Sequence, residues 1–271
     1  MAELLRVGAV ALQAKVNEEK ENLKNTVDWV VEAARQKVGL LLFPELSLTG
    51  YSTNGPVVQP ITVGGKTWAA LQELACRYEI VLAAGMAWQE DGEKRLAHGL
   101  WLPSGEVLLY FKTHLGQREK EEYTPGDSLP VFQLPQATVG IQLCLEQHFP
   151  EITQTLVLKG AQLILCPHAT PRLSPAERQR SWDISLRARA YDNCVFILAV
   201  NQVGDNGQGT KYPGGAMLIN PLGQVIAEDF SGQEGLIVGD VDLGQVIESR
   251  VTPQGLCRRF YPPQRRPDLY K

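Results

Sequence analysis

The sequence predicts a mixed α/β (α+β) fold, a four-layer α-β-β-α sandwich with an internal pseudo-two-fold axis. Apolar segments of strand length alternate with amphipathic helical segments, a pattern typical of βαβ units. The same alternation recurs in the same order in the second half of the chain, and no linker separates the halves. Two mixed sheets, each with helices on one side, would bury their bare faces against each other. Residues 1–271 are therefore expected to form a single domain.

The first βαβ unit opens the chain. Residues 6–13 (RVGAVALQ) form a short apolar strand, and a helix is expected from about Asn17 to Lys37, with Asn17 as its N-cap. The apolar side chains of this helix recur at helical spacing, at Leu23, Val27, Val30, Val31 and Ala34. The continuous apolar run VGLLLFPE (38–45) follows, and it is predicted to be a strand buried on both faces.

Three segments of the first half resemble segments of the second half. The pairs are LLLFPE (40–45) with LILCPH (163–168), CRYEIVLAAG (76–85) with AYDNCVFILA (190–199), and LWLPSGEVLLY (100–110) with LINPLGQVIAE (218–228). In the third pair, each segment has a Pro-x-Gly turn that indicates a β-hairpin. Because the pairs occur in the same order and at similar separations, they predict two related halves rather than an array of short repeats.

Composition and charge exclude several classes of function. Hydrophobic residues make up 44% of the chain and the formal net charge is −4, so no basic surface for nucleic acid is expected. No apolar run approaches the ~20 residues of a membrane helix, and the N-terminus lacks the features of a signal peptide. The five scattered cysteines indicate reduced thiols. The sequence therefore predicts a cytoplasmic protein with no membrane or nucleic-acid partner.

Three side chains at segment ends could carry chemistry. Glu45 follows the buried strand, and Lys112 ends the apolar run of the first hairpin. Cys144 ends a strand expected at 139–143, before a helix expected near Pro150. A thiol at such a turn can be exposed to a pocket and can have its pKa lowered by neighbouring amides and cations. Together these groups would supply a nucleophile, a carboxylate base and a fixed cation.

The motifs around these residues resemble those of a known family. They are FPELSLTGY (43–51), KTHL (112–115), CLEQHFPE (144–151), RARAYDN (187–193), GGAMLINPLGQV (214–225) and RRPDLY (265–270). In order and spacing they resemble the nitrilase (carbon-nitrogen hydrolase) superfamily over essentially the whole chain. The resemblance implies a single nitrilase-like domain that forms a homodimer or a higher homo-oligomer. The proline-rich residues 258–271 are expected to form a C-terminal surface tail.

The resemblance also implies roles for the residues of a Glu-Lys-Cys triad. Cys144 would attack the substrate carbon while Glu45 takes the thiol proton and later delivers it to the leaving ammonia. Lys112 would stabilise the oxyanion together with the backbone N–H of Leu145. The family's second active-site glutamate maps to Glu119, ahead of YTPGD, although two neighbouring glutamates are close enough to be alternatives; they are Glu121 and Glu122.

The second half is expected to shape the substrate pocket. His168 holds the position in LILCPH that Glu45 holds in LLLFPE, so both strand ends would open towards one cleft. Arg172, in the loop that follows, could bind a substrate carboxylate through two parallel hydrogen bonds. Tyr51 would form another wall. The alternatives that remain open are a packed aromatic for Tyr51, a loop histidine for His168 and an exposed position for Arg172.

No cofactor and no metal are expected. Four soft side chains could suggest zinc, but their spacing matches no structural zinc pattern; they are Cys144, His148, Cys166 and His168. The triad chemistry requires neither a metal nor an organic cofactor.

The implied function is a thiol-dependent hydrolase of non-peptide C–N bonds in a small amide or N-carbamoyl substrate. Leu145 and the HFPE segment favour the amidase and carbamoylase branches, whereas Glu146 resembles the nitrilases, so action on a small nitrile is an alternative. An ammonia-supplying glutaminase domain would need a second domain. A catalytically silent scaffold would not need the intact triad.

Overall fold

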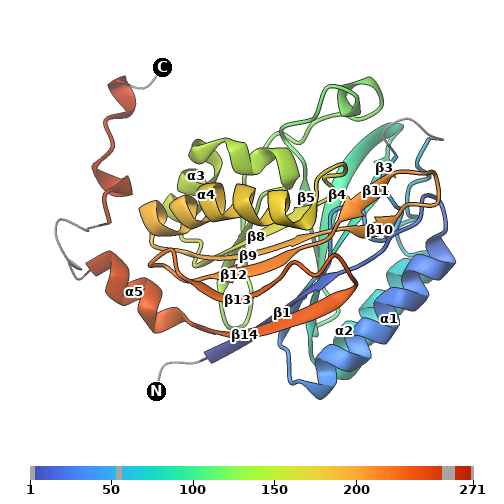
Figure 1. Ribbon diagram of the computed structural model, residues 1–271, viewed down its shortest axis with the longest axis horizontal. Helices are drawn as coiled ribbons and strands as arrows, with labels where there is room; N and C mark the ends of the chain where they lie inside the picture. The colour runs from blue at the N-terminus through green and yellow to red at the C-terminus, as the bar shows by residue number, and fades with distance from the viewer. Residues whose placement is uncertain (1–3, 53–56, 252–259, 270–271) are drawn as a thin grey trace.

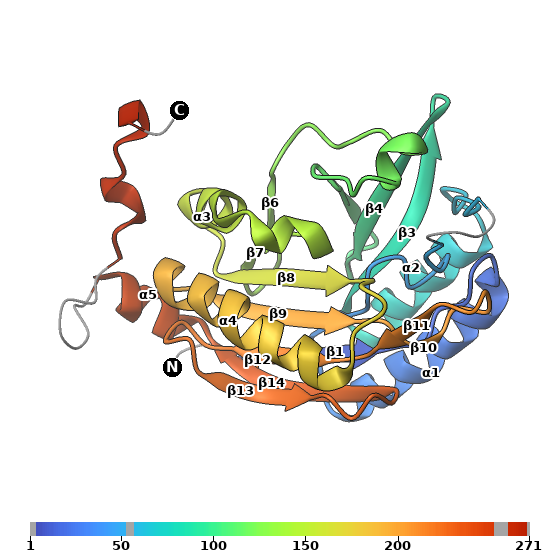
Figure 2. The same ribbon diagram turned by 45° about the horizontal axis from the view of Figure 1, so that its top comes forward.

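The computed structural model describes residues 4–52, 57–251 and 260–269. Two six-stranded sheets lie face to face, and helices cover the outer face of each, which confirms the predicted α-β-β-α layers (Figures 1 and 2). The first sheet has the order β14 (Gly235–Asp242), β1 (Leu4–Ala11), β2 (Leu40–Leu42), β3 (Val81–Glu90), β4 (Glu93–Trp101) and β5 (Val107–Phe111).

The second sheet has the order β13 (Val225–Asp229), β12 (Ala216–Ile219), β9 (Phe196–Asn201), β8 (Leu163–His168), β7 (Thr138–Ile141) and β6 (Val131–Gln133). A separate two-stranded ribbon joins β10 (Val203–Asp205) and β11 (Lys211–Pro213). The α-helices are α1 (Glu19–Arg35), α2 (Lys66–Tyr78), α3 (Pro150–Leu158), α4 (Pro175–Asn193) and α5 (Leu243–Val251). Four short 3₁₀ helices complete the described elements: η1 (Glu119–Glu121), η2 (Cys144–His148), η3 (Pro262–Gln264) and η4 (Pro267–Leu269).

The two sheets have the same topology, which confirms the predicted pseudo-two-fold relation. In the first sheet β1, β2 and β3 are parallel and are connected through α1 and α2; in the second, β7, β8 and β9 are parallel and are connected through α3 and α4. An antiparallel hairpin follows in each half, β4–β5 in the first and β12–β13 in the second. The three pairs of similar segments therefore lie at equivalent positions of the two sheets.

Alternating side chains along each strand divide the core into three apolar layers. Leu42 and Leu165 lie in the layer between the sheets. Leu41 and Phe43 pack under α1 and α2, whereas Ile164 packs under α3 and α4. Because both faces of the central strands are covered, β2 is fully buried, as its continuous apolar sequence predicts.

The N-terminal end of α1 differs from the sequence prediction. The helix begins at Glu19, and Asn17 is not its N-cap but adopts a left-handed conformation with φ of 63°. The Asn17 amide instead holds the loop before α2, because its Nδ2 donates to Val57 O at 3.1 Å and its Oδ1 accepts from Gln59 N at 2.8 Å. The fully buried positions of α1 are Asn22, Thr26, Val30 and Ala33. Val30 belongs to the predicted apolar face, whereas the other three each precede a predicted position by one residue.

Several other sequence expectations concern thiols, tails and ligands. Cys76, Cys144 and Cys166 are free thiols, and Cys257 lies outside the described residues. Of the expected tail 258–271, residues 260–269 are described, and most of their side chains are exposed. Among the described residues no helix is long and apolar enough to cross a membrane. Nor does the described part of the chain contain a group of three or more His, Cys, Asp or Glu residues arranged to hold a metal ion.

Candidate active site

Glu45 lies just beyond the end of β2 and is 2% exposed. The chain leaves the sheet at Phe43, whose N–H donates to Ala83 O, and then turns sharply. The Glu45 carboxylate accepts hydrogen bonds from Lys112 Nζ at 2.8 Å and from Ala169 N at 3.1 Å. Its backbone carbonyl accepts from Gln202 Nε2 at 2.7 Å. The second half of the chain therefore fixes both the backbone and the side chain of Glu45.

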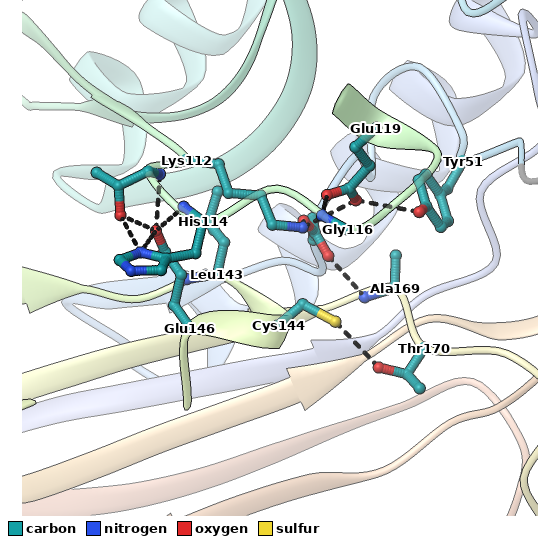
Figure 3. Close-up of polar contacts among 12 residues, drawn as sticks. Tyr51, Lys112, His114, Gly116, Glu119, Leu143, Cys144, Glu146, Ala169 and Thr170 are labelled. Carbon is teal, nitrogen blue, oxygen red and sulfur yellow. Dashed lines mark hydrogen bonds and ion pairs between the residues drawn. The ribbon is translucent and has the colours of Figure 1, made fainter. Parts of the chain in front are cut away.

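Lys112 follows β5, and its ammonium group lies between two carboxylates (Figure 3). Nζ is 2.8 Å from Glu45 Oε1 and 2.9 Å from Glu119 Oε1, and the Lys112 side chain is 2% exposed. Burial by itself lowers the pKa of Lys112, but the negative charges of Glu45 and Glu119 and the hydrogen bond to Glu45 oppose it, and the pKa is raised. The residue is therefore a permanently charged, immobile cation.

Glu119 is the glutamate of its segment that contacts Lys112. It is 5% exposed, whereas Glu121 and Glu122 are exposed to solvent. Besides Lys112, its carboxylate accepts from Tyr51 Oη at 3.0 Å and from Gly116 N at 2.6 Å. Tyr51 thus lies at the site through a contact with Glu119 (Figure 3).

Cys144 is the first residue of η2, shortly after β7 ends at Ile141. Its φ of 44° is in the left-handed region, a strained conformation of a kind that concentrates at functional sites in proteins. The side chain is partly exposed, and Sγ lies 3.1 Å from Thr170 Oγ1 (Figure 3). Burial and the Glu45 charge raise the pKa of the thiol to about 11, and Lys112 offsets only part of this rise. The lowered thiol pKa expected for such a turn is therefore not found.

Glu146 is a site residue that the sequence analysis treated only as a marker of the family branch. It is fully buried, and its carboxylate accepts from Tyr110 Oη at 2.8 Å, Thr113 N at 2.7 Å and Leu143 N at 2.6 Å. Figure 3 shows it next to His114 and Leu143. These bonds tie the segment after Lys112 to the turn that carries the nucleophile.

Leu145, the residue after the nucleophile, lines a cavity of about 420 Å³. The cavity is lined by Thr113, His114, Leu115, Lys120, Tyr123, Pro125, Leu145 and Phe149. The His114 and Phe149 rings pack at 4.4 Å between centroids and form one wall. Its walls come mainly from the loop after β5, and Leu145 and Phe149 complete them.

The structure places His168 and Arg172 differently from the triad residues. His168 is fully buried; its ring packs against Trp182 at 5.0 Å, and its Nδ1 lies 2.8 Å from Cys166 O. Glu45 lies beyond the end of β2, but the matching residue His168 is still within β8. The His168 side chain therefore follows the alternation of side chains along the strand and points towards α4. Arg172 is exposed, with φ of 65°. Among the described residues, no hydrogen bond joins either side chain to the triad.

Comparisons with known proteins agree with this geometry. The family model described as carbon-nitrogen hydrolase matches residues 6–251. A probable nitrilase of Schizosaccharomyces pombe is 27% identical, covering 98% of this chain and 97% of its own length. An omega-amidase of Xenopus tropicalis is 30% identical, covering 92% of this chain and 91% of its own.

A solved structure is similar as well. A mutant of an amidase from Nesterenkonia, of the nitrilase superfamily, superposes with a TM-score of 0.76 at 25% identity, covering 91% of this chain and 94% of that one. Sequence motifs, sheet topology and relatives therefore lead to one conclusion: this chain belongs to the carbon-nitrogen hydrolase family of the nitrilase superfamily.

Proposed function

We propose that this protein is a thiol-dependent amidase that hydrolyses the non-peptide C–N bond of a small amide or N-carbamoyl substrate and releases ammonia. The observation that carries the proposal is the buried chain Glu45–Lys112–Glu119 beside the partly exposed thiol of Cys144. Relatives named as amidases support the choice of an amide substrate. No cofactor enters the reaction, and the site is proposed to operate in a homodimer or higher homo-oligomer.

The first half-reaction needs a base, because the thiol pKa of about 11 keeps Cys144 protonated at neutral pH. Glu45 takes the Sγ proton as sulfur attacks the carbonyl carbon. The carbonyl π electrons move to oxygen, and Lys112 and the N–H of Leu145 stabilise the resulting oxyanion. Burial raises the pKa of Glu45 against the opposing effect of Lys112, which suits a carboxylate that must both accept and return a proton.

The second half-reaction restores the enzyme. The tetrahedral intermediate collapses, the C–N bond breaks, and Glu45 returns its proton so that ammonia leaves and a thioester on Cys144 remains. Glu45 then takes a proton from water as the hydroxyl oxygen attacks the thioester. The C–S bond breaks, the sulfur recovers the proton, and the acid product leaves. Glu119 holds Lys112 charged and oriented throughout.

A nitrilase acting on a small nitrile is the second candidate, favoured by the S. pombe relative and by Glu146 after the nucleophile. A catalytically silent protein on the same fold is the candidate from another class. Matched amide, N-carbamoyl and nitrile substrates with the same carbon skeleton separate these possibilities, since a silent protein acts on none of them.

The test is ammonia release from that panel by the wild type and by Cys144→Ala. We expect the substitution to lower the rate by more than the ~10²–10³ that loss of one oxyanion donor costs. Circular dichroism should show an unchanged fold, and Cys76→Ala, which alters an exposed thiol, should keep full activity. Full ammonia release by Cys144→Ala would refute the mechanism.

A further inference from the structure

The hydroxyl group of Thr170 contacts the nucleophile directly. Its Oγ1 lies 3.1 Å from Cys144 Sγ, and Figure 3 shows the two side chains pointing towards each other. Thr170 lies two residues after the end of β8, in the loop that leads to α4. Both residues are half-buried. The catalytic cycle described above gives this contact no role, although it involves the reacting sulfur atom.

A buried asparagine fixes the backbone of Thr170 on both sides. The N–H of Thr170 donates to Asn201 Oδ1 at 2.9 Å, and Asn201 Nδ2 donates to the Thr170 carbonyl at 3.1 Å and to Gly214 O at 3.3 Å. Asn201 is the last residue of β9 and is fully buried. The preceding residue, Ala169, donates its N–H to Glu45 Oε2 at 3.1 Å. A two-residue segment fastened to β9 therefore contacts both the base and the nucleophile.

The strength of the Thr170 contact depends on the charge of the sulfur. A hydroxyl can donate or accept a hydrogen bond, so it suits the protonated thiol in either direction. Once Glu45 has taken the proton, the sulfur has no hydrogen left and the hydroxyl must donate. A hydrogen bond to an ionised acceptor is stronger than one between neutral groups. In agreement, the Thr170 contact opposes the effect of burial on the pKa of Cys144. The contact therefore favours the charged sulfur over the resting thiol.

We propose that Thr170 is a further catalytic residue, whose hydroxyl donates a hydrogen bond to the negative charge on Cys144 Sγ. This inference rests on the proposed thiol-dependent hydrolysis and adds a donor that acts on sulfur, whereas Lys112 acts on the substrate oxygen. The charge appears when the thiol attacks and again when the sulfur leaves the thioester. The thiol proton still passes to Glu45, and no bond of Thr170 forms or breaks. Because the contact is strongest in the charged states, its loss should lower kcat more than it raises KM.

The test compares Thr170→Val, which removes the hydroxyl but keeps a branched side chain, with Thr170→Ser, which keeps the hydroxyl. The first readout is the rate at which iodoacetamide alkylates Cys144 at pH 7, followed by peptide mass spectrometry. The second is kcat and KM with a neutral amide. We expect Thr170→Val to lower the alkylation rate and kcat by about 10- to 100-fold, the effect of one hydrogen bond to a charged group. Thr170→Ser should keep most of both.

Two controls separate this effect from a general change in the protein. Alkylation of the exposed thiol of Cys76, measured in the same samples, should proceed at one rate in every variant. Thr138→Val removes a hydroxyl that bonds to Gln133 Oε1 at 2.8 Å, at the start of β7. It should leave the alkylation of Cys144 and both kinetic constants unchanged.

An unchanged alkylation rate in Thr170→Val would overturn the inference, and so would equal losses in Thr170→Val and Thr170→Ser, which would indicate a role in packing. If Thr170→Val does not fold, Thr170→Ala takes its place, since it differs from Thr170→Ser by one oxygen atom, and equal rates in these two variants reject the inference. If amides are hydrolysed but the hydroxyl has no effect on either readout, only this inference fails. If the wild type hydrolyses no amide, the proposed function fails, and the alkylation rates still decide whether Thr170 stabilises the charged sulfur.

Discussion

At the scale of single residues, burial decides the proton chemistry of the site. The ammonium group of Lys112 forms ion pairs with the carboxylates of Glu45 and Glu119. All three side chains are almost fully buried. The opposing charges keep Lys112 protonated, while burial keeps the Cys144 proton in place until a base removes it. Glu45 is the group that must change its charge during the reaction, and its raised pKa makes it the residue that limits activity in acid.

The pH dependence of kcat/KM follows from these shifts. Only the ionised form of Glu45 can accept the thiol proton, so activity is lost as pH falls through its pKa. Because that pKa is raised, the acid limb should lie above the ~4.3 of an ordinary glutamate. We expect no loss of activity just above neutral pH, because the pKa of Lys112 is raised and the pKa of Cys144 is about 11.

A profile of kcat/KM against pH, measured with a neutral amide between about pH 4 and pH 10, locates the acid limb that the Glu45 pKa sets in the free enzyme. Activity that instead grows steadily towards pH 10 would follow ionisation of the thiol, and Glu45 would then not be the base.

At the scale of elements, strand ends and tight turns position the reactive groups. Glu45 is held where the chain leaves β2, and this turn packs directly on β3 at Gly85. The Gly85 carbonyl accepts from Leu48 N at 3.0 Å. On the opposite sheet, the Glu146 carboxylate ties the nucleophile turn to the segment after β5. The separation of base, cation and nucleophile therefore depends on a few backbone contacts.

Replacing Gly85 should disturb Glu45 without touching the substrate. A Cβ atom at Gly85 would lie 2.3 Å from Leu46 N and 3.0 Å from the Glu45 Cα atom, so the turn must move. We expect Gly85→Ala to lower kcat by about 10²-fold, the typical effect of misplacing a catalytic group by about 1 Å. Steady-state kinetics with thermal denaturation measures both effects.

The matched control is Gly39→Ala, at the entry to β2, where the nearest atom to the new Cβ is Leu5 Cδ1 at 3.4 Å. This variant should retain most of the wild-type kcat. Equal activity of Gly85→Ala and wild type would show that the turn does not fix the position of the base.

The sequence was sufficient to predict the elements whose pattern is local. Apolar runs predicted the buried strands, and the Pro-x-Gly turns predicted both hairpins. The sequence did not predict that Asn17 would hold a loop or that Glu146 would anchor two turns. Each of these depends on contacts between segments distant along the chain, which local spacing does not encode.

At the scale of the whole molecule, the active site joins the two related halves. The first half supplies Glu45, Lys112 and Glu119, and the second supplies Cys144 and the backbone N–H of Ala169. The base and the nucleophile are thus held by different sheets, so catalysis requires the complete sandwich. The outer helices α3 and α4 lie side by side over the second sheet (Figure 1).

These two helices form the face through which we expect the homodimer to assemble. Ile184 on α4 is 69% exposed and Leu158 on α3 is 43% exposed, apolar surface that a partner subunit would cover. Light scattering after size exclusion should give at least twice the monomer mass, and Ile184→Glu should shift the protein towards monomer. Val63→Glu, near α2 on the other outer layer, is the control and should not. A monomer at every concentration would contradict the prediction.

The central claim, a covalent acyl-enzyme on Cys144, is tested most directly by mass spectrometry of the protein quenched in acid during turnover of an amide. The account predicts that the intact mass increases by the mass of the amide minus that of ammonia. Digestion should place the increase on the peptide that contains Cys144, and Cys144→Ala should show none. Turnover without any adduct in the wild type, or an equal adduct in Cys144→Ala, would contradict the account.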